Sequence, residues 1–368
     1  MSGPPPTTHG GNGAVANALG LIDRSVDRLR TRSSLSLVIA GASVAGLVVL
    51  PQLPWVDTFW AGVLTRMMIF AIFAMSLDLM LGYTGLPSLG HAAFFGSGAY
   101  TVAIFHNEGV VQNFWVSLPL GIFVATAMAA IFGLLALRTQ GAYFLMITLA
   151  LAQVVFAIGW GWKAMTNGDD GIQAAFEAGG GLPGSYGNAV EIYYLVLGFL
   201  IVAAALMYLV VRSPFGHVLV GIRDSESRMR VLGYNTWLYK YIVFLVSGAF
   251  AGLAGCLFAY YNALVTPAQL SILPSAEVLL MVAVGGPGTL FGPALGAGFF
   301  VFLENFISDY TERWILILGI IFVLVVLVAP QGIFRAIKTQ RVTEQVRRLF
   351  TGWQAARAAK ATAEEVES

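Results

Sequence analysis

Charged residues are scarce in this sequence, and cysteine is almost absent. Only 11% of the 368 residues are charged, whereas 58% are hydrophobic and the mean hydropathy is +0.78. Soluble globular proteins carry roughly a quarter charged residues, so that class is excluded. A single cysteine, Cys256, excludes an intrachain disulfide. The net charge of +1 provides no basic surface for nucleic acid.

Motifs for cofactors, metals and catalysis are also missing. No G-x-x-x-x-G-K-[ST] loop occurs, so the chain lacks this device for cradling ATP phosphates. The histidines are scattered at His9, His91, His106 and His217, and no metal cluster or nucleophile–base arrangement stands out. We therefore expect no catalytic residue, no metal site and no cofactor bound by this chain. A polytopic membrane enzyme would need such a cluster near one membrane face.

Long apolar runs dominate the rest of the sequence. Segments of about 20 apolar residues are the signature of membrane-spanning helices. The pattern predicts an all-α, polytopic membrane protein with about ten transmembrane or partial helices and glycine-rich broken segments. The third, eighth and ninth segments are short enough to be half-helices. The predicted segments are 35–50, 58–81, 91–106, 114–137, 142–162, 192–211, 238–264, 273–284, 292–306 and 314–329.

The distribution of lysine and arginine predicts the orientation. If all ten segments cross and the N-terminus is cytoplasmic, every basic residue except Arg66, Lys163 and Arg313 lies in a cytoplasmic part. This gives a cytoplasmic tail at 1–34, a transmembrane domain at 35–330 and a second cytoplasmic tail at 331–368. The domain contains a long outer loop at 163–191 and an inner loop at 213–237. Residues 21–32 fit a basic amphipathic surface segment or a disordered tail equally well.

Two stretches are too rich in glycine for helices that face lipid. They are GYTGLPSLGHAAFFGSGAY at Gly82–Tyr100 and GGPGTLFGPALGAG at Gly285–Gly298. Irregular backbone at membrane depth is tolerated only where it is buried in protein or lines a cavity. The two stretches therefore predict broken or tightly packed elements beside a translocation path.

Five motifs in the same order identify a resemblance. The chain resembles the permease subunits of ABC importers for branched-chain amino acids, of the LivM/LivH type, and the long outer loop favours the LivM branch. The resemblance covers about 75–332. Its motifs are Gly82–Tyr100, RTQGAYFLMITLALAQ at Arg138–Gln153, TNGDDGI at Thr166–Ile172, RDSESRMRVLGYN at Arg223–Asn235 with SGAFAGLAG at Ser247–Gly255, and SAEVLLMVAVGGPGTLFGPALGA at Ser275–Ala297.

The resemblance implies a division of labour among subunits. This chain would form the path together with a second permease in a bacterial inner membrane. Two cytoplasmic ATPases would bind ATP and Mg²⁺, and an extracytoplasmic solute-binding protein would deliver the substrate. Asp78 stands where the family usually has asparagine, Pro87 where leucine is common, and the Glu226-Ser227-Arg228 run lacks the usual alanines. These departures leave open a related small amide or carboxylate as substrate.

The resemblance also marks two groups of site residues. The inner loop is expected to couple to the ATPases through a charged helix that ends at Gly233, with Arg223, Asp224, Glu226, Arg228 and Arg230 as its charged positions. From composition alone the same loop reads as an ordinary solvated connection. The path or its packing is expected to involve Asp78, Tyr83, Thr84, Gly85, Ser88, His91, Phe94, Phe95, Glu277, Gly286, Gly288 and Thr289.

Structural interpretations of the path residues remain beside the functional ones. Asp78 lines the path or satisfies amides freed in GYTG, and Glu277 lines it or favours a helix N-terminus after Pro274. His91, Phe94 and Phe95 line the path or pack against neighbouring helices. The alternative function is a self-sufficient secondary transporter or channel for a small polar solute. Few intramembrane charges are available for the ion coupling that such a transporter needs.

Overall fold

The computed structural model describes residues 46–48, 51, 58–174, 189–311 and 313–328. The chain divides into two units, Met1–Val56 and Asp57–Ser368, and nearly all described residues belong to the second. The predicted segment at 35–50 lies largely outside the described residues. Both predicted tails, including the stretch at 21–32, lie wholly outside them.

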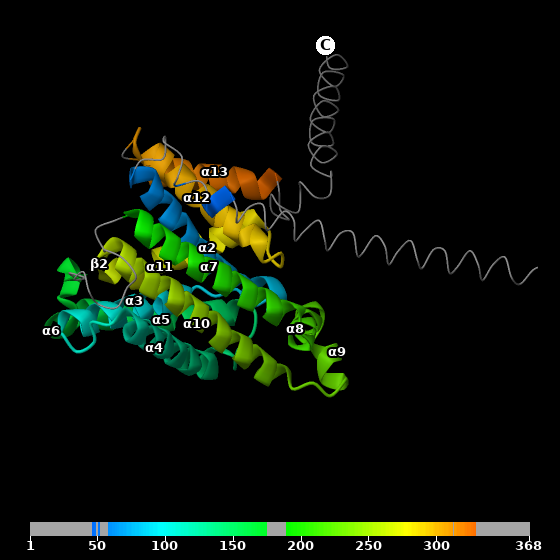
Figure 1. Ribbon diagram of the computed structural model, residues 1–368. Coiled ribbons are helices and arrows are strands. Elements are labelled where there is room, and N and C mark those ends of the chain that lie inside the picture. Colours follow the sequence, from blue (N-terminus) through cyan, green and yellow to red (C-terminus); the bar gives the residue numbers. More distant parts are fainter. Residues whose placement is uncertain (1–45, 49–50, 52–57, 175–188, 312, 329–368) are drawn as a thin grey trace, which may run out of the picture. The chain divides into compact units, whose positions relative to one another are not determined.

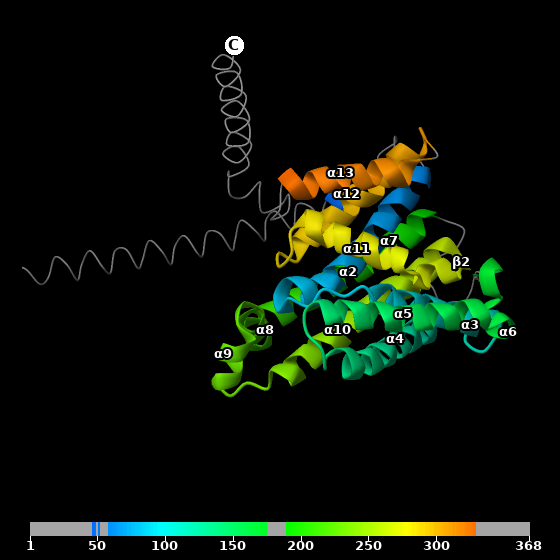
Figure 2. The ribbon, with the colours of Figure 1, turned by 180° about the vertical axis from the view of Figure 1, so that it is seen from behind.

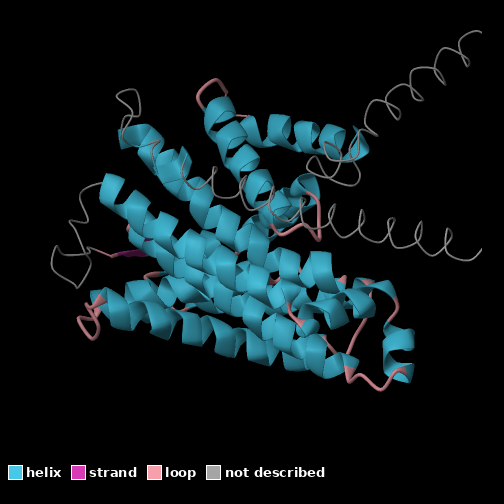
Figure 3. Cartoon of the chain, turned by 45° about the vertical axis from the view of Figure 1, so that its right-hand side comes forward, coloured by secondary structure: helices cyan, strands magenta, loops and turns pink. Residues whose placement is uncertain are grey.

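The remaining nine predicted segments are helices whose ends lie within three residues of the predicted ends. This confirms the all-α class, and Figure 3 shows how completely helices make up the described part. The long helices are α2 (Thr58–Thr84), α3 (His91–Asn107), α4 (Phe114–Ala136), α5 (Ala142–Gly161), α7 (Ala189–Arg212), α10 (Thr236–Asn262), α11 (Ile272–Gly285), α12 (Phe291–Ser308) and α13 (Trp314–Val328).

Six of these helices are long and apolar enough to cross a membrane: α2, α4, α5, α7, α10 and α12. Helix α3 has 17 residues and α11 has 14, so both fall short of the roughly 20 residues of a straight span. The short third and eighth segments were predicted. The ninth differs, because α12 extends to 18 residues.

Short elements occupy the two ends of the second unit. Helices α8 (Pro214–Asp224) and α9 (Glu226–Val231) lie at one end, and α6 (Lys163–Thr166) and β2 (Leu264–Val265) lie at the other (Figures 1 and 2). Strand β2 pairs antiparallel with β1 (Ile172–Gln173), joining Ile172 to Val265. The short 3₁₀ helices η2 (Gly168–Asp170) and η3 (Pro267–Leu270) accompany them.

Local capping explains where several helices begin. The side chain of Asn113 accepts the amide of Trp115 at α4, and Asn235 accepts the amide of Leu238 at α10. Ser213 accepts the amide of Gly216 at α8, with Pro214 in the first turn. Each cap satisfies one of the amides that a helix start leaves without an intrahelical partner.

The core is the contact of α10 with α2, α3 and α4, and small residues set its spacing. A Cβ at Gly252 would lie 2.3 Å from the Cβ of Ala125, and a Cβ at Gly255 only 1.9 Å from the carbonyl oxygen of Phe95. Ser247, on the same side of α10 as Gly255, donates a hydrogen bond to the Ser76 carbonyl oxygen over 2.5 Å. The small residues on this face of α10 let the backbones of neighbouring helices approach closely.

The close contact at Gly255 predicts a stability difference between two glycines. Gly255→Ala should lower the free energy of unfolding by about 1–3 kcal/mol, because a backbone carbonyl cannot move aside for the added methyl group. The matched control is Gly198→Ala on α7, where nothing lies within 4 Å of the new Cβ. Thermal unfolding of the purified protein in detergent measures both. A midpoint for Gly255→Ala equal to that of Gly198→Ala would contradict the packing.

Candidate functional site

Both glycine-rich stretches are broken, as predicted. Helix α2 ends at Thr84, Gly85 has a φ of 74°, and α3 begins at His91. Helix α11 ends at Gly285, and Gly288 has a φ of 79° before α12 begins. Glycine adopts these positive φ angles without the strain that a side chain would cause. Each break follows a helix that runs toward the α8–α9 end.

The buried carboxylate of Asp78 on α2 joins the two breaks. It accepts hydrogen bonds from the amide of Gly288 over 2.7 Å and from that of Leu290 over 3.0 Å. These amides belong to the turn that leads into α12, where helix geometry leaves N–H groups free. Of the two roles predicted for Asp78, lining the path or satisfying amides freed in GYTG, the structure shows a form of the second. The amides that it satisfies lie in the second glycine-rich stretch.

Arg223, at the end of α8, contacts both breaks. Its Nη1 donates a hydrogen bond of 2.5 Å to the carbonyl oxygen of Gly82 in the last turn of α2. A Cβ at Gly288 would lie 3.1 Å from Nη1, and a Cβ at Gly85 would lie 3.1 Å from the Arg223 Cγ. We call Asp78, Gly82, Gly85, Arg223, Gly288 and Leu290 the break junction. It places the inner loop in direct contact with both glycine-rich stretches.

The inner loop forms two short helices where one was predicted. Ser225 separates α8 from α9 with an extended backbone, and its carbonyl oxygen accepts the amide of Met229. A Cβ at Gly221 would lie 2.8 Å from the Met229 sulfur, so α9 folds back against α8. Arg223 and Asp224 consequently belong to α8, and the charges that follow them belong to α9.

Gly233 ends α9, as predicted. Its φ is 88°, and the amide of Tyr234 reaches back to the carbonyl oxygen of Met229 over 3.1 Å. The amide of Gly233 donates a hydrogen bond to the backbone carbonyl oxygen of Arg230. This pair of bonds around a left-handed glycine is a common helix C-terminus.

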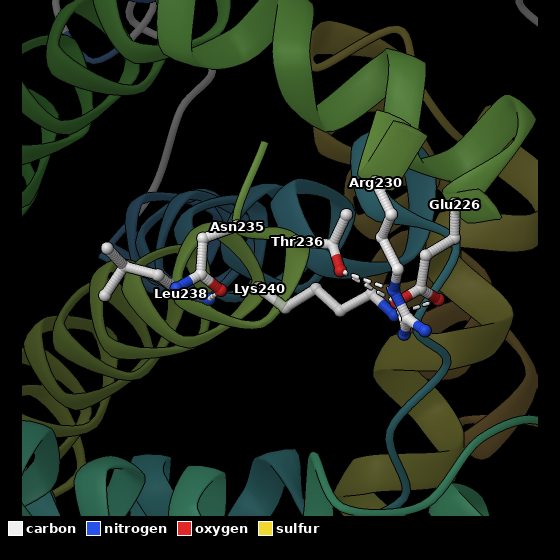
Figure 4. A network of polar contacts seen from close by, with 6 residues as sticks. All are labelled: Glu226, Arg230, Asn235, Thr236, Leu238 and Lys240. Carbon is white, nitrogen blue, oxygen red and sulfur yellow. Dashed lines mark hydrogen bonds and ion pairs between the residues drawn. The ribbon is translucent and has the colours of Figure 1, made fainter. Parts of the chain in front are cut away.

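Glu226 ties α9 to the start of α10. Its Oε2 accepts a hydrogen bond from Lys240 Nζ over 2.5 Å, and its Oε1 accepts one from Arg230 Nη2 over 2.6 Å. The Thr236 hydroxyl also donates to Oε1 and accepts from Arg230 Nε. Figure 4 shows these four side chains converging, while Asn235 caps α10 beside them. The carboxylate thus connects three donors on two helices.

The charge state of Glu226 follows from these contacts. Partial burial by itself raises the pKa, but the hydrogen bonds from Lys240 and Arg230 outweigh it, so the pKa lies below its ordinary value of 4.5. The carboxylate is therefore ionised at neutral pH. Its contribution to holding α9 on α10 is lost only as the pH falls through that lowered pKa.

Three other residues predicted for the path, His91, Phe94 and Phe95, are buried between the helices of the bundle. His91 is fully buried, shares a hydrogen bond of 2.8 Å with the Ser76 hydroxyl and stacks on Phe73. Phe94 and Phe95 are also buried among aromatic rings.

The hydroxyl groups make local backbone contacts. Thr84 donates to Leu79, Ser88 accepts the amide of Gly90, and Thr289 donates to Gly286. Tyr83 is buried in the last turn of α2. Of the predicted path residues, only Asp78, Gly85 and Gly288 lie in the break junction.

A second charged group lies nearer the opposite end of α2. Arg66 on α2 pairs with Glu304 on α12 over 2.8 Å, and both of their charges act on Glu277 of α11. Tyr261 of α10 lies beside them, since its hydroxyl would be 3.5 Å from a Cβ at Gly62, one turn from Arg66. We call Arg66, Tyr261, Glu277 and Glu304 the far-end cluster.

Sequence reasoning found only Glu277 of this cluster. Helix α11 begins at Ile272, so Glu277 lies in the second turn and does not favour the helix N-terminus as predicted. Arg66 and Glu304 were missed as site residues, although each is a charge within an apolar segment. Such charges indicate functional or paired positions. Among the described residues, no group of three or more His, Cys, Asp or Glu side chains could hold a metal ion.

The described part of the chain is a bundle of apolar helices with two glycine-rich breaks that the charged inner loop contacts, as in a polytopic membrane transport subunit. The model of the family described as branched-chain amino acid transport system, permease component, matches residues 59–328. The chain belongs to this family.

Curated relatives cover most of the chain. It is 31% identical to the high-affinity branched-chain amino acid transport system permease protein LivM of Escherichia coli, over 75% of this chain and 70% of that relative. It is 23% identical to a probable LivM permease of Methanocaldococcus jannaschii, over 69% of this chain and 83% of that relative. No solved structure matches the chain.

The break junction predicts graded effects at Asp78. Asp78→Ala should leave the amides of Gly288 and Leu290 without this acceptor, at up to about 1–3 kcal/mol each. Asp78→Asn retains one acceptor oxygen and should lose about half of that. Hydrogen exchange of the purified protein measures the effect locally, as faster exchange at the amides of Gly288 and Leu290. Thr126→Ala on the surface of α4 is the control. Unchanged exchange at these amides in Asp78→Ala would contradict the contact.

Proposed function

We propose that this chain forms one half of the transmembrane path of an ATP-driven importer for branched-chain amino acids. The observation that carries the proposal is the contact of Arg223 with both helix breaks, because it links the loop outside the bundle to the irregular backbone inside it. Family membership and the names of the relatives supply the substrate class. A second permease of the same family completes the path.

The break junction and Glu226 supply the mechanical part of the proposal. Arg223 holds the end of α2, and Glu226 holds the start of α10 through Lys240. A displacement of α8 and α9 therefore acts on two central helices together. Helix α10 packs against both α2 and α3, and His91 of α3 shares a hydrogen bond with Ser76 of α2, so the motion would reach the break between α2 and α3. Movement of these helices would switch access between the two sides of the membrane.

The tip of the inner loop provides the surface for the ATPase. Val231 is 88% exposed and Leu232 66% exposed, and the half-exposed ring of Tyr234 adjoins them. Apolar side chains gathered at the end of a charged loop are typical of a protein contact. We assign them to docking of a cytoplasmic ATPase, with two ATPases in the full complex. ATP and Mg²⁺ belong to those subunits, and the present chain carries out no hydrolysis.

The proposed orientation places α8 and α9 in the cytoplasm. Arg212, Arg223 and Lys240 lie at this end, and Arg138 joins them because Gly133 near the end of α4 packs on Tyr241 near the start of α10. The opposite end, with β1 and β2, would face the solute-binding protein. This arrangement follows the positive-inside rule in a bacterial inner membrane.

The docking surface predicts a selective loss of assembly. Val231→Asp together with Leu232→Asp should abolish co-purification of the ATPases, because two carboxylates cannot be buried unpaired in a contact. The permease itself should keep its yield and unfolding midpoint. Val110→Asp is the matched control, since Val110 is 66% exposed between α3 and α4. Retention of the ATPases by the double variant would rule out this surface.

The function is tested by reconstituting the whole complex in liposomes. The wild-type complex, with leucine-loaded binding protein outside and ATP at the ATPase face, should accumulate leucine. The double charge reversal Arg223→Glu with Glu226→Lys should lower uptake at least tenfold while ATP hydrolysis and membrane insertion persist. Survival of transport in that variant would exclude the coupling role. Uptake by this chain alone under an ion gradient would favour the secondary-transporter alternative.

A further inference from the structure

The far-end cluster has hydrogen-bond donors and acceptors that its own contacts do not use. The guanidinium of Arg66 lies over the Phe70 ring at 5.5 Å and donates to Glu304 through Nη2. A guanidinium has five N–H donors, and the Arg66 side chain remains 30% exposed. Glu277 forms no ion pair or hydrogen bond with the other described residues. The cluster thus has free donors and a free carboxylate.

Lipid cannot satisfy such groups. Charged side chains within membrane segments face a bundle interior or a water-filled cavity, because hydrocarbon offers them no hydrogen bonds. Arg66 of α2 and Glu304 of α12 are paired, and α11, which carries Glu277, packs against both of these helices. Arg66 is 16 positions before Gly82, or about 24 Å along α2 from the Arg223 contact. The cluster therefore lies in the part of the helices remote from the inner loop, and the Arg66 side chain keeps an exposed portion there.

We propose that the far-end cluster binds the headgroup of the transported α-amino acid, with Arg66 receiving the α-carboxylate and Glu277 the α-ammonium group. This inference rests on the proposed function and adds a binding site to it. Glu304 accepts a hydrogen bond from Nη2 of Arg66 and so fixes the orientation of the guanidinium. The remaining N–H groups are left for a carboxylate. The Tyr261 hydroxyl adds a further donor.

The charges of the cluster favour a zwitterion over a simple anion or cation. Glu304 pairs with Arg66, and the carboxyl group of Glu277 has no ion-pair partner among the described residues. An α-ammonium group supplies the missing positive charge, and its α-carboxylate occupies the free donors of Arg66. An amine without the carboxylate leaves Arg66 unfilled, and an acid without the ammonium leaves Glu277 unpaired. Each loss leaves a desolvated polar group, which costs more than a missing apolar contact.

The test uses the complete complex in liposomes with saturating leucine-loaded binding protein. Glu277→Gln keeps the shape of the side chain and removes its charge, and it should lower leucine uptake about tenfold or more. Arg66→Lys keeps the ion pair with Glu304 but loses the paired N–H donors of the guanidinium, and it should lower leucine uptake by a similar factor. In both variants the stimulation of ATP hydrolysis by the loaded binding protein should stay within about twofold. Asp309→Asn, beyond the end of α12, is the control and should transport normally.

A charge swap separates a binding role from a structural one. Arg66→Glu with Glu304→Arg rebuilds the ion pair but moves the guanidinium to α12, so stability should return while uptake stays low. Recovery of both stability and uptake in the swap, or wild-type uptake by Glu277→Gln, would overturn the inference. A wild-type complex that hydrolyses ATP but takes up no leucine would instead overturn the proposed substrate.

Discussion

A helix broken inside a membrane must find partners for its backbone groups within the protein, and here the carboxylate of Asp78 meets that requirement. Two amides at the start of α12 point at its two oxygens. The turn between α11 and α12 therefore depends on α2 lying beside it. The position of α2 is in turn held by Arg223 through Gly82.

This dependence explains why glycine is concentrated at the breaks and on α10. A side chain at Gly82 would collide with the Asp78 carboxylate, and one at Gly255 with the backbone of α3. The glycines at 85 and 288 supply the positive φ angles of the turns. Close packing and irregular backbone thus arise from the same residues.

Hydropathy predicted the helices well, because the length of an apolar run is a local property of the sequence. The high glycine content predicted that Gly82–Tyr100 and Gly285–Gly298 break. It did not predict that the breaks touch each other, since Asp78 and Gly288 are 210 positions apart and neither carries a local sign of the other. The pairing of Arg66 with Glu304 was not predicted either, because these two residues are 238 positions apart. Ser225 divided the inner loop because α9 gains contacts by folding back onto α8, which local propensity does not record.

Helix α2 connects the two charged groups of the structure. At one end of α2, the carbonyl oxygen of Gly82 accepts a hydrogen bond from Arg223. Toward the other end, Arg66 pairs with Glu304. Between them nearly every side chain of α2 is buried against α7, α10 and α12, so the helix is held along its length. A close-packed helix transmits displacement as a body because its neighbours leave no room for local bending. In the proposed mechanism, a displacement of Arg223 would therefore alter the position of Arg66 relative to Glu277 on α11. Binding at one end and coupling at the other then act on one equilibrium, as energetic linkage between two sites requires.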